Sequence, residues 1–128
     1  MTGNISVILL TIAFVLFTAK HFLADFILQT NWMWRNKDQK QDWLAALAAH
    51  AGCHALLTLV LALVLMPALW WLGIVDFAIH AMIDRCRGVI GRRLGLTFEQ
   101  TGWWWLFGID QGLHQLTHFA FVIALIAR

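Results

Sequence analysis

Four long apolar stretches fill most of this 128-residue chain, and they constrain the fold more than any other feature. One bilayer crossing needs about 20 predominantly apolar residues, so a chain of this length has room for about four crossings joined by short connections. Hydrophobic residues make up 61% of the chain and charged residues 12%, whereas an ordinary soluble domain is roughly 25% charged. We therefore predict an all-α membrane protein with four transmembrane helices in a single domain, residues 1–128. The apolar stretches are residues 5–27, 43–66, 68–84 and 103–127.

The basic residues predict the orientation of these helices. Of nine Lys and Arg, three lie in the connection 31–42 and four in the connection 85–102, while the middle connection is a turn around Pro67. Cytoplasmic loops carry an excess of Lys and Arg. Both basic connections are therefore predicted to be cytoplasmic and both termini extracytoplasmic.

Histidines and acidic residues recur at a spacing of four along the chain. Chance would place roughly one such pair in a sequence of this composition, but seven are present. This spacing puts two side chains on one face of a helix, one turn apart. One pair, Asp38 with Asp42, lies in a polar connection and is interpreted as solvated surface. The other six pairs are His21 with Asp25, His50 with His54, Asp76 with His80, His80 with Asp84, Asp110 with His114, and His114 with His118.

The ten residues of these six pairs are predicted to lie at one depth, in the cytoplasmic half of the membrane. Ionisable groups are costly in lipid, so they must face the bundle interior and satisfy one another or a cation. Bundle cores build metal sites from such pairs on facing helices, and nitrogen and oxygen donors without thiolate suit zinc, iron or manganese. We predict a cage for two or more divalent metal ions, with a purely structural polar network as the alternative. The predicted ligands are His21, Asp25, His50, His54, Asp76, His80, Asp84, Asp110, His114 and His118.

The order of the motifs indicates an internal repeat. The pattern HxxxD followed by HxxxH occurs once in residues 1–66 and again in residues 67–128. Both hairpins are predicted to run inward and then outward, so the two halves would be related by an axis along the membrane normal. The second half adds Asp76 and Asp110, each one turn before a motif of its own. These two carboxylates are the candidates for a catalytic general base.

The leading functional hypothesis is an intramembrane metal-dependent hydrolase acting on a lipid or lipid-linked phosphate or ester from the cytoplasmic side. Two metal ions could activate water and hold the substrate oxygens, while loop arginines could bind the head group. A divalent metal transporter or sensor is the alternative, although transport needs alternating access and the outer half of the chain is uninterruptedly apolar. The candidate head-group residues are Arg85, Arg87, Arg92 and Arg93.

The same residues also bear on other functional classes and on the binding partners of the protein. A di-iron or haem redox protein is a second alternative, because histidine pairs in a four-helix bundle can ligate haem. Four aspartates beside the histidines argue against haem, since they would be unpaired without a multivalent cation. The basic residues are too few and too close to the membrane for a nucleic-acid surface. A unit this small could form a homodimer.

The residues 20–30, KHFLADFILQT, together with the paired histidines and the segment 80–84, resemble a bacterial membrane family known as domain of unknown function 3307. The resemblance covers nearly the whole chain. It implies a small, multi-pass helical protein of the bacterial inner membrane and implies nothing about a reaction. The intramembrane His and Asp are more distantly similar to inner-membrane metal-dependent hydrolases, although no contiguous motif aligns. The HxxxD pairs also resemble the zinc site of cation-diffusion transporters, but the additional HxxxH pairs suggest a larger cluster.

Overall fold

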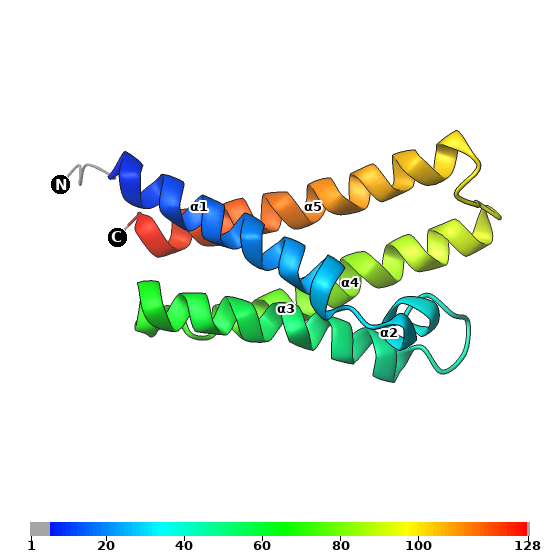
Figure 1. Cartoon of the computed structure of the whole chain (residues 1–128), viewed down its shortest axis with the longest axis horizontal. Helices are drawn as coiled ribbons and strands as arrows, with labels where there is room; N and C mark the ends of the chain where they lie inside the picture. The colour runs from blue at the N-terminus through cyan, green and yellow to red at the C-terminus, as the bar shows by residue number, and fades with distance from the viewer. Residues whose placement is uncertain (1–5, 128) are drawn as a thin grey trace.

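The computed structural model describes residues 6–127, and within them it contains helices and turns but no strand. Four long helices form an antiparallel bundle in which α1 and α4 run in one direction and α3 and α5 in the other (Figure 1). The predicted all-α class is therefore confirmed. The elements are α1 (Val7–Phe22), the π-helical turn η1 (Leu23–Leu28), α2 (Asn31–Asn36), α3 (Leu44–Leu65), the 3-10 turn η2 (Pro67–Leu69), α4 (Leu72–Arg93) and α5 (Thr101–Ile126).

Within residues 6–127, two helical segments are long and apolar enough to cross a membrane. They are Val7–Leu28, which joins α1 to η1, and Leu44–Leu65, which is α3; their mean hydropathies are 2.1 and 2.0. Helix α4 is less apolar because it contains Asp76, Asp84 and the arginines of its last turns.

Helix α4 is longer than its apolar pattern predicts. The sequence interpretation ended the helix at Asp84 and placed the following arginines in a loop, but α4 continues to Arg93. Charged residues do not disfavour a helix, and the first stop signal is Gly95, whose φ is 61°. The Gly95 amide donates to the Arg92 carbonyl, and the next amide donates to the Gly91 carbonyl, which is the hydrogen-bond pattern of a Schellman motif. The arginines predicted in the loop therefore lie on the last helical turns.

The two ends of the bundle differ. Helix α2 and the α4–α5 connection lie at one end, which we call the basic end (Figure 1). The beginning of α1, the turn η2 and the end of α5 lie at the opposite end. The beginning of α1 and the end of α5 therefore lie opposite both basic connections.

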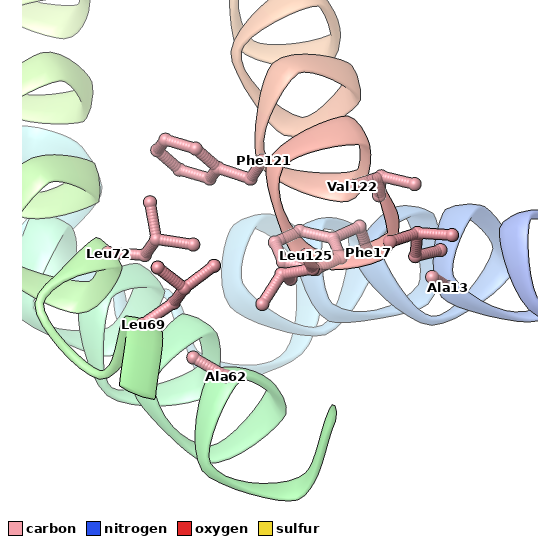
Figure 2. Packing of buried hydrophobic residues seen from close by; sticks show 9 residues of the cluster. Ala13, Phe17, Ala62, Leu69, Leu72, Phe121, Val122 and Leu125 are labelled. Carbon is pink, nitrogen blue, oxygen red and sulfur yellow. The ribbon is translucent and has the colours of Figure 1, made fainter. Parts of the chain in front are cut away.

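An apolar cluster fills the half of the bundle near η2. Figure 2 shows side chains from α1, α3, η2, α4 and α5 packed together there. Phe17 of α1 lies at the edge of this cluster that faces His118. Its ring centroid is 6.3 Å from that of Phe121. We call the following residues the apolar cluster: Ala13, Phe17, Ala62, Leu69, Leu72, Phe121, Val122, Leu125 and Ile126.

Helices α3 and α4 approach one another closely at Gly73. A Cβ atom added there would lie 3.0 Å from Leu59 Cβ and 3.1 Å from the Ala55 carbonyl oxygen. Small residues at helix contacts allow two backbones to approach in this way. The close crossing helps to bring the histidines of α3 opposite His80 of α4.

Candidate metal centre

The ten predicted ligands lie inside the bundle, on the side of the apolar cluster nearer the basic end. Nine of them are 4% exposed or less, and the Asp25 side chain is 13% exposed. Four-residue spacing explains why both members of a pair face inward. The tertiary structure determines which pairs meet.

Six of the ten side chains form two groups that could hold a metal ion, with their ligand atoms within 4.8 Å of one another. The Asp25 group combines one carboxylate with three imidazoles, and the Asp84 group combines one carboxylate with two. The imidazole of His80 belongs to both groups. The Asp25 group is Asp25, His50, His54 and His80, and the Asp84 group is His80, Asp84 and His114.

The Asp25 group joins η1, α3 and α4. His54 Nε2 lies 2.8 Å from Asp25 Oδ1, and His50 Nε2 lies 3.3 Å from the same oxygen. His50 Nε2 also faces His80 Nε2 at 3.4 Å. Three imidazole nitrogens and one carboxylate oxygen therefore converge on one small volume.

Asp25 is carried by the π-helical turn η1, which the sequence interpretation read as ordinary α-helix. Such turns occur mostly as single-turn interruptions of α-helices, often at functional sites. His21 Nε2 still lies 3.0 Å from Asp25 Oδ2, so the pair keeps the contact that its spacing predicted. Residues 23–28 contain neither Gly nor Pro. We find no local sequence signal that could have located the turn.

The Asp84 group contains a cation from the protein itself. His114 Nε2 lies 3.1 Å from Asp84 Oδ1, and Lys37 donates to Asp84 Oδ2 at 2.7 Å. The rings of His80 and His114 stack with centroids 4.0 Å apart. Lys37 is 6% exposed, although the sequence interpretation placed it in a cytoplasmic polar connection.

Lys20 is a second buried cation that sequence reasoning did not assign to the site. Its ammonium donates to Asp76 Oδ2 at 2.8 Å, and Thr58 Oγ1 donates to the same oxygen at 2.6 Å. Lys20 lies near the end of the first predicted helix, on the side of the two basic connections, so the sequence predicts that it is a cytoplasmic charge. The structure places it in the bundle interior instead, at 3% exposure. The sequence feature that could have identified Lys20 as part of the site is its position inside an apolar helix, next to His21.

These cations change the charge balance of the site. The argument that all four aspartates need a multivalent cation is wrong for three of them, because each lies within 3.5 Å of a Lys or Arg nitrogen. The fourth, Asp25, contacts imidazoles at 2.8 to 3.3 Å, and no Lys or Arg nitrogen of the described residues lies within ion-pair distance of it. The three pairs are Asp76 with Lys20, Asp84 with Lys37, and Asp110 with Arg87.

His21, His118 and Asp110 lie outside both groups. His21 Nε2 contacts Gln111 Oε1 at 3.0 Å, and Gln111 in turn donates to Asp110 Oδ2 at 3.1 Å. The His118 ring lies against Phe17, with centroids 5.7 Å apart. His118 therefore marks the boundary between the site and the apolar cluster.

A cavity of about 910 Å³ leads from the basic end to the site. It is lined by residues of η1, α2, α4 and α5 together with the turn after α2. Three carboxylates of the site reach it, and three cations and several aromatic rings line it. The polar lining that bears on function is Asp25, Asp38, Asp84, Asp110, Arg35, Lys37 and Arg87.

Only one of the four predicted head-group arginines lines this cavity. Arg87 does so, and it pairs with Asp38 at 2.6 Å. Arg35, which was not predicted, also lines the cavity.

The other predicted head-group arginines lie elsewhere on the last turns of α4. The Arg85 guanidinium lies 3.8 Å from the centre of the Trp43 ring and donates to the Gln39 carbonyl. Arg92 donates to the Asp38 carbonyl, and Arg93 is exposed. Asp38, interpreted from its spacing as solvated surface, is therefore a half-buried partner of α4.

Comparison with known proteins places the chain in a family. It matches no curated protein and no solved structure. The family described as "Protein of unknown function (DUF3307)" matches residues 12–127, which is nearly the whole chain. The chain therefore belongs to the DUF3307 family.

Proposed function

We propose that this protein is a metal-dependent hydrolase of the bacterial inner membrane that acts on a lipid or lipid-linked phosphate or ester. The four long helices would cross the bilayer as two tandem hairpins, with the basic end in the cytoplasm. The observation that carries the proposal is the Asp25 group, whose four ligand atoms lie within 4.8 Å of one another beside a cavity that Asp25 itself lines.

The donors of the Asp25 group fit a divalent metal. Three imidazole nitrogens and one carboxylate oxygen match the ligand types that zinc, manganese and iron accept. His50 Nε2 and His80 Nε2 face each other at 3.4 Å, and a shared cation would satisfy both lone pairs. Asp25 is mostly shielded from solvent and has no Lys or Arg partner among the described residues, which favours the same conclusion, because burying an uncompensated charge is costly.

The chemistry of such a site follows from its position beside the cavity. A divalent metal, when bound, would supply Lewis acidity for attack by water on the substrate. Asp25 both lines the cavity and belongs to the Asp25 group, so a molecule in the cavity would contact the metal beside Asp25. Asp110 is our candidate for the general base, because it lines the cavity and its buried Oδ1 accepts no hydrogen bond from the described residues. We assign Asp76, held by Lys20 and Thr58, a structural role.

The charges of the cavity indicate an order of binding. Its carboxylates, Asp25, Asp38, Asp84 and Asp110, outnumber its three cations by one formal charge. A phosphate head group would therefore be repelled until a divalent cation has bound. Arg35 and Arg87 would then contact the head group, and the aromatic lining would contact the lipid portion.

The apolar cluster favours hydrolysis over transport. It fills the half of the bundle opposite the cavity, where Ala13, Ala62 and Val122 are fully buried. An ion that crosses the membrane needs a site that opens alternately to both sides. A cavity that opens at the basic end suits a catalytic site.

Metal content tests the first part of the proposal. Protein purified without a chelator should contain at least one equivalent of zinc, manganese or iron by elemental analysis. His54→Ala should lose this metal. His118→Ala is the matched control, because it removes a buried imidazole outside both groups and should keep the metal. A wild-type protein without metal, folded by circular dichroism, would overturn the proposal.

Hydrolysis tests the second part. Detergent-solubilised protein should release the head group from one member of a panel of phosphomonoester, phosphodiester, pyrophosphate and carboxylic ester lipids. Chelation should stop the release, and Asp110→Asn should reduce turnover while keeping the metal. Metal uptake into proteoliposomes, without any hydrolysis, would support the transporter alternative.

Topology can be tested with the chain's own cysteines. Cys86 is exposed near the basic end, whereas Cys53 is half-buried in α3. A membrane-impermeant maleimide should modify Cys86 from the cytoplasmic side of oriented membrane vesicles. Modification from the opposite side would contradict the proposed orientation.

A further inference from the structure

A short segment closes the basic end of the bundle over the site. It consists of α2 and the turn that follows, residues 31–42, and we call it the strap. Five strap residues line the cavity, so its position determines access to the site. These residues are Trp34, Arg35, Lys37, Asp38 and Gln39.

The strap is fastened to α4 by contacts of two kinds. Its outer contacts come from arginines of α4 and include the pair of Arg87 with Asp38, whose side chains are 17% and 31% exposed. Partly exposed pairs of this kind contribute little to stability. The inner contact joins Lys37 to Asp84, whose side chains are 8% and 3% exposed. Lys37 is therefore the anchor of the strap.

Lys37 also contacts one of the two groups that could hold a metal ion. Its ammonium lies 2.7 Å from Asp84 Oδ2, and Asp84 belongs to the group completed by His80 and His114. One buried carboxylate cannot neutralise an ammonium and a divalent ion together, because the two cations repel strongly in a low-dielectric interior. Binding of a metal and docking of Lys37 are therefore mutually exclusive at Asp84.

We propose that Lys37 is a tethered cation that competes with a second divalent metal for the Asp84 group, so that binding of this metal releases the strap. The inference rests on the proposed function, in which the Asp25 group holds the first metal. Because the two groups share His80, the first metal leaves the Asp84 group with two unshared ligands. The second metal therefore binds more weakly than the first and acts as the signal that opens the cavity.

Titration with Zn²⁺ alone tests the competition. The full-length wild-type protein in detergent should bind one equivalent tightly and a second weakly. Lys37→Met should tighten the second equivalent by about 5- to 150-fold, the usual range for coupling between two sites, and leave the first unchanged. Lys37→Arg, which keeps a cation, should resemble the wild type. Lys40→Met is the matched control, because it removes the same charge from an exposed position of the strap.

Tryptic cleavage tests release of the strap in the wild-type protein, so this test does not depend on the folding of a variant. Burial of Lys37 should protect the following peptide bond in the protein that carries one equivalent of Zn²⁺. The second equivalent should increase cleavage after Lys37 and leave cleavage after the exposed Arg93 of α4, which lies outside the strap, unchanged. A control with denatured protein shows that Zn²⁺ does not alter the trypsin itself.

The outcomes separate this inference from the proposed function. One tight equivalent with the same weak second equivalent in wild type and Lys37→Met would overturn the competition and leave the proposed function standing. Cleavage after Lys37 that does not change with the second equivalent would overturn strap release. Wild-type protein that binds no Zn²⁺ at all would overturn both.

Discussion

The two halves of the bundle interior are held together by different forces. Near η2, the apolar cluster packs aliphatic and aromatic side chains with 9% exposure or less. Nearer the basic end, six histidines and three aspartates are buried together with Lys20 and Lys37, and the Asp25 side chain beside them is 13% exposed. If the helices cross a bilayer as we propose, the hydrophobic effect does not drive one helix onto another, and the apolar half then depends on close packing. The polar half depends on the pairing of its charges.

The polar half differs from the apolar cluster in that most of its carboxylates have a cationic partner, as burial of charge requires. Three aspartates of the polar half have Lys or Arg partners within 3.5 Å. Asp25 contacts imidazoles instead. Among the described residues, Asp25 is therefore the one aspartate of the polar half that has no Lys or Arg partner, and this is where we place the first metal.

The largest effect is expected from breaking a buried pair in the polar half. Lys20→Met should destabilise the protein by about 3–5 kcal/mol, because it leaves Asp76 buried and uncompensated. The double variant Lys20→Met, Asp76→Leu should recover most of this loss. Equilibrium unfolding in mixed micelles measures both, with Lys40→Met as the exposed control. Equal losses in the single and double variants would show that the charge pair is not the cause.

The next largest effect is expected from metal binding, which should depend on the polar half of the bundle and not on the apolar cluster. Zn²⁺ at 100 times its dissociation constant should stabilise the folded wild type by about 2.7 kcal/mol, and chelation should remove this gain. Asp25→Asn should abolish the gain, because the amide carries no charge. Phe121→Leu, a change in the apolar cluster, should keep it. A zinc-dependent gain that persists in Asp25→Asn would remove Asp25 from the site.

A methyl group added where α3 and α4 cross should show how much stability depends on the close approach of these two helices. Gly73→Ala should cost about 1–3 kcal/mol, because the new Cβ would lie 3.0 Å from Leu59 Cβ and 3.1 Å from a carbonyl oxygen. Gly108→Ala is the matched control, since no atom lies within 4 Å of its added Cβ. Equal stability of the two variants would mean that α3 and α4 separate easily.

The smallest effect is expected at the boundary between the halves. Phe17→Leu should cost about 1 kcal/mol, because Leu fills most of the space of Phe in the apolar cluster. It should leave zinc binding unchanged, since Phe17 touches His118 rather than a member of the Asp25 group. Unfolding and zinc titration on the same sample provide both values. A loss of zinc affinity would indicate that the two halves are coupled through His118.

Much of the candidate site follows from local spacing. The four-residue interval identified the inward faces that carry His50 with His54 and Asp84 with His80, because helix geometry depends only on neighbouring residues. The end of α4 was less predictable, since its charged last turns resemble a loop in composition. Lys37 was missed because its partner, Asp84, lies 47 positions along the chain.

The sequence by itself determined the helical class, the antiparallel order of the long helices and the ten inward-facing histidines and aspartates. Their spacing and apolar surroundings are local properties, which nearest-neighbour geometry and transfer free energy control. The tertiary structure decided which ligands meet, through the close crossing at Gly73 and the π-helical turn that carries Asp25. It also decided that Lys20 and Lys37 neutralise two of the aspartates. Partners on different helices depend on how those helices rotate and cross, which no single segment encodes.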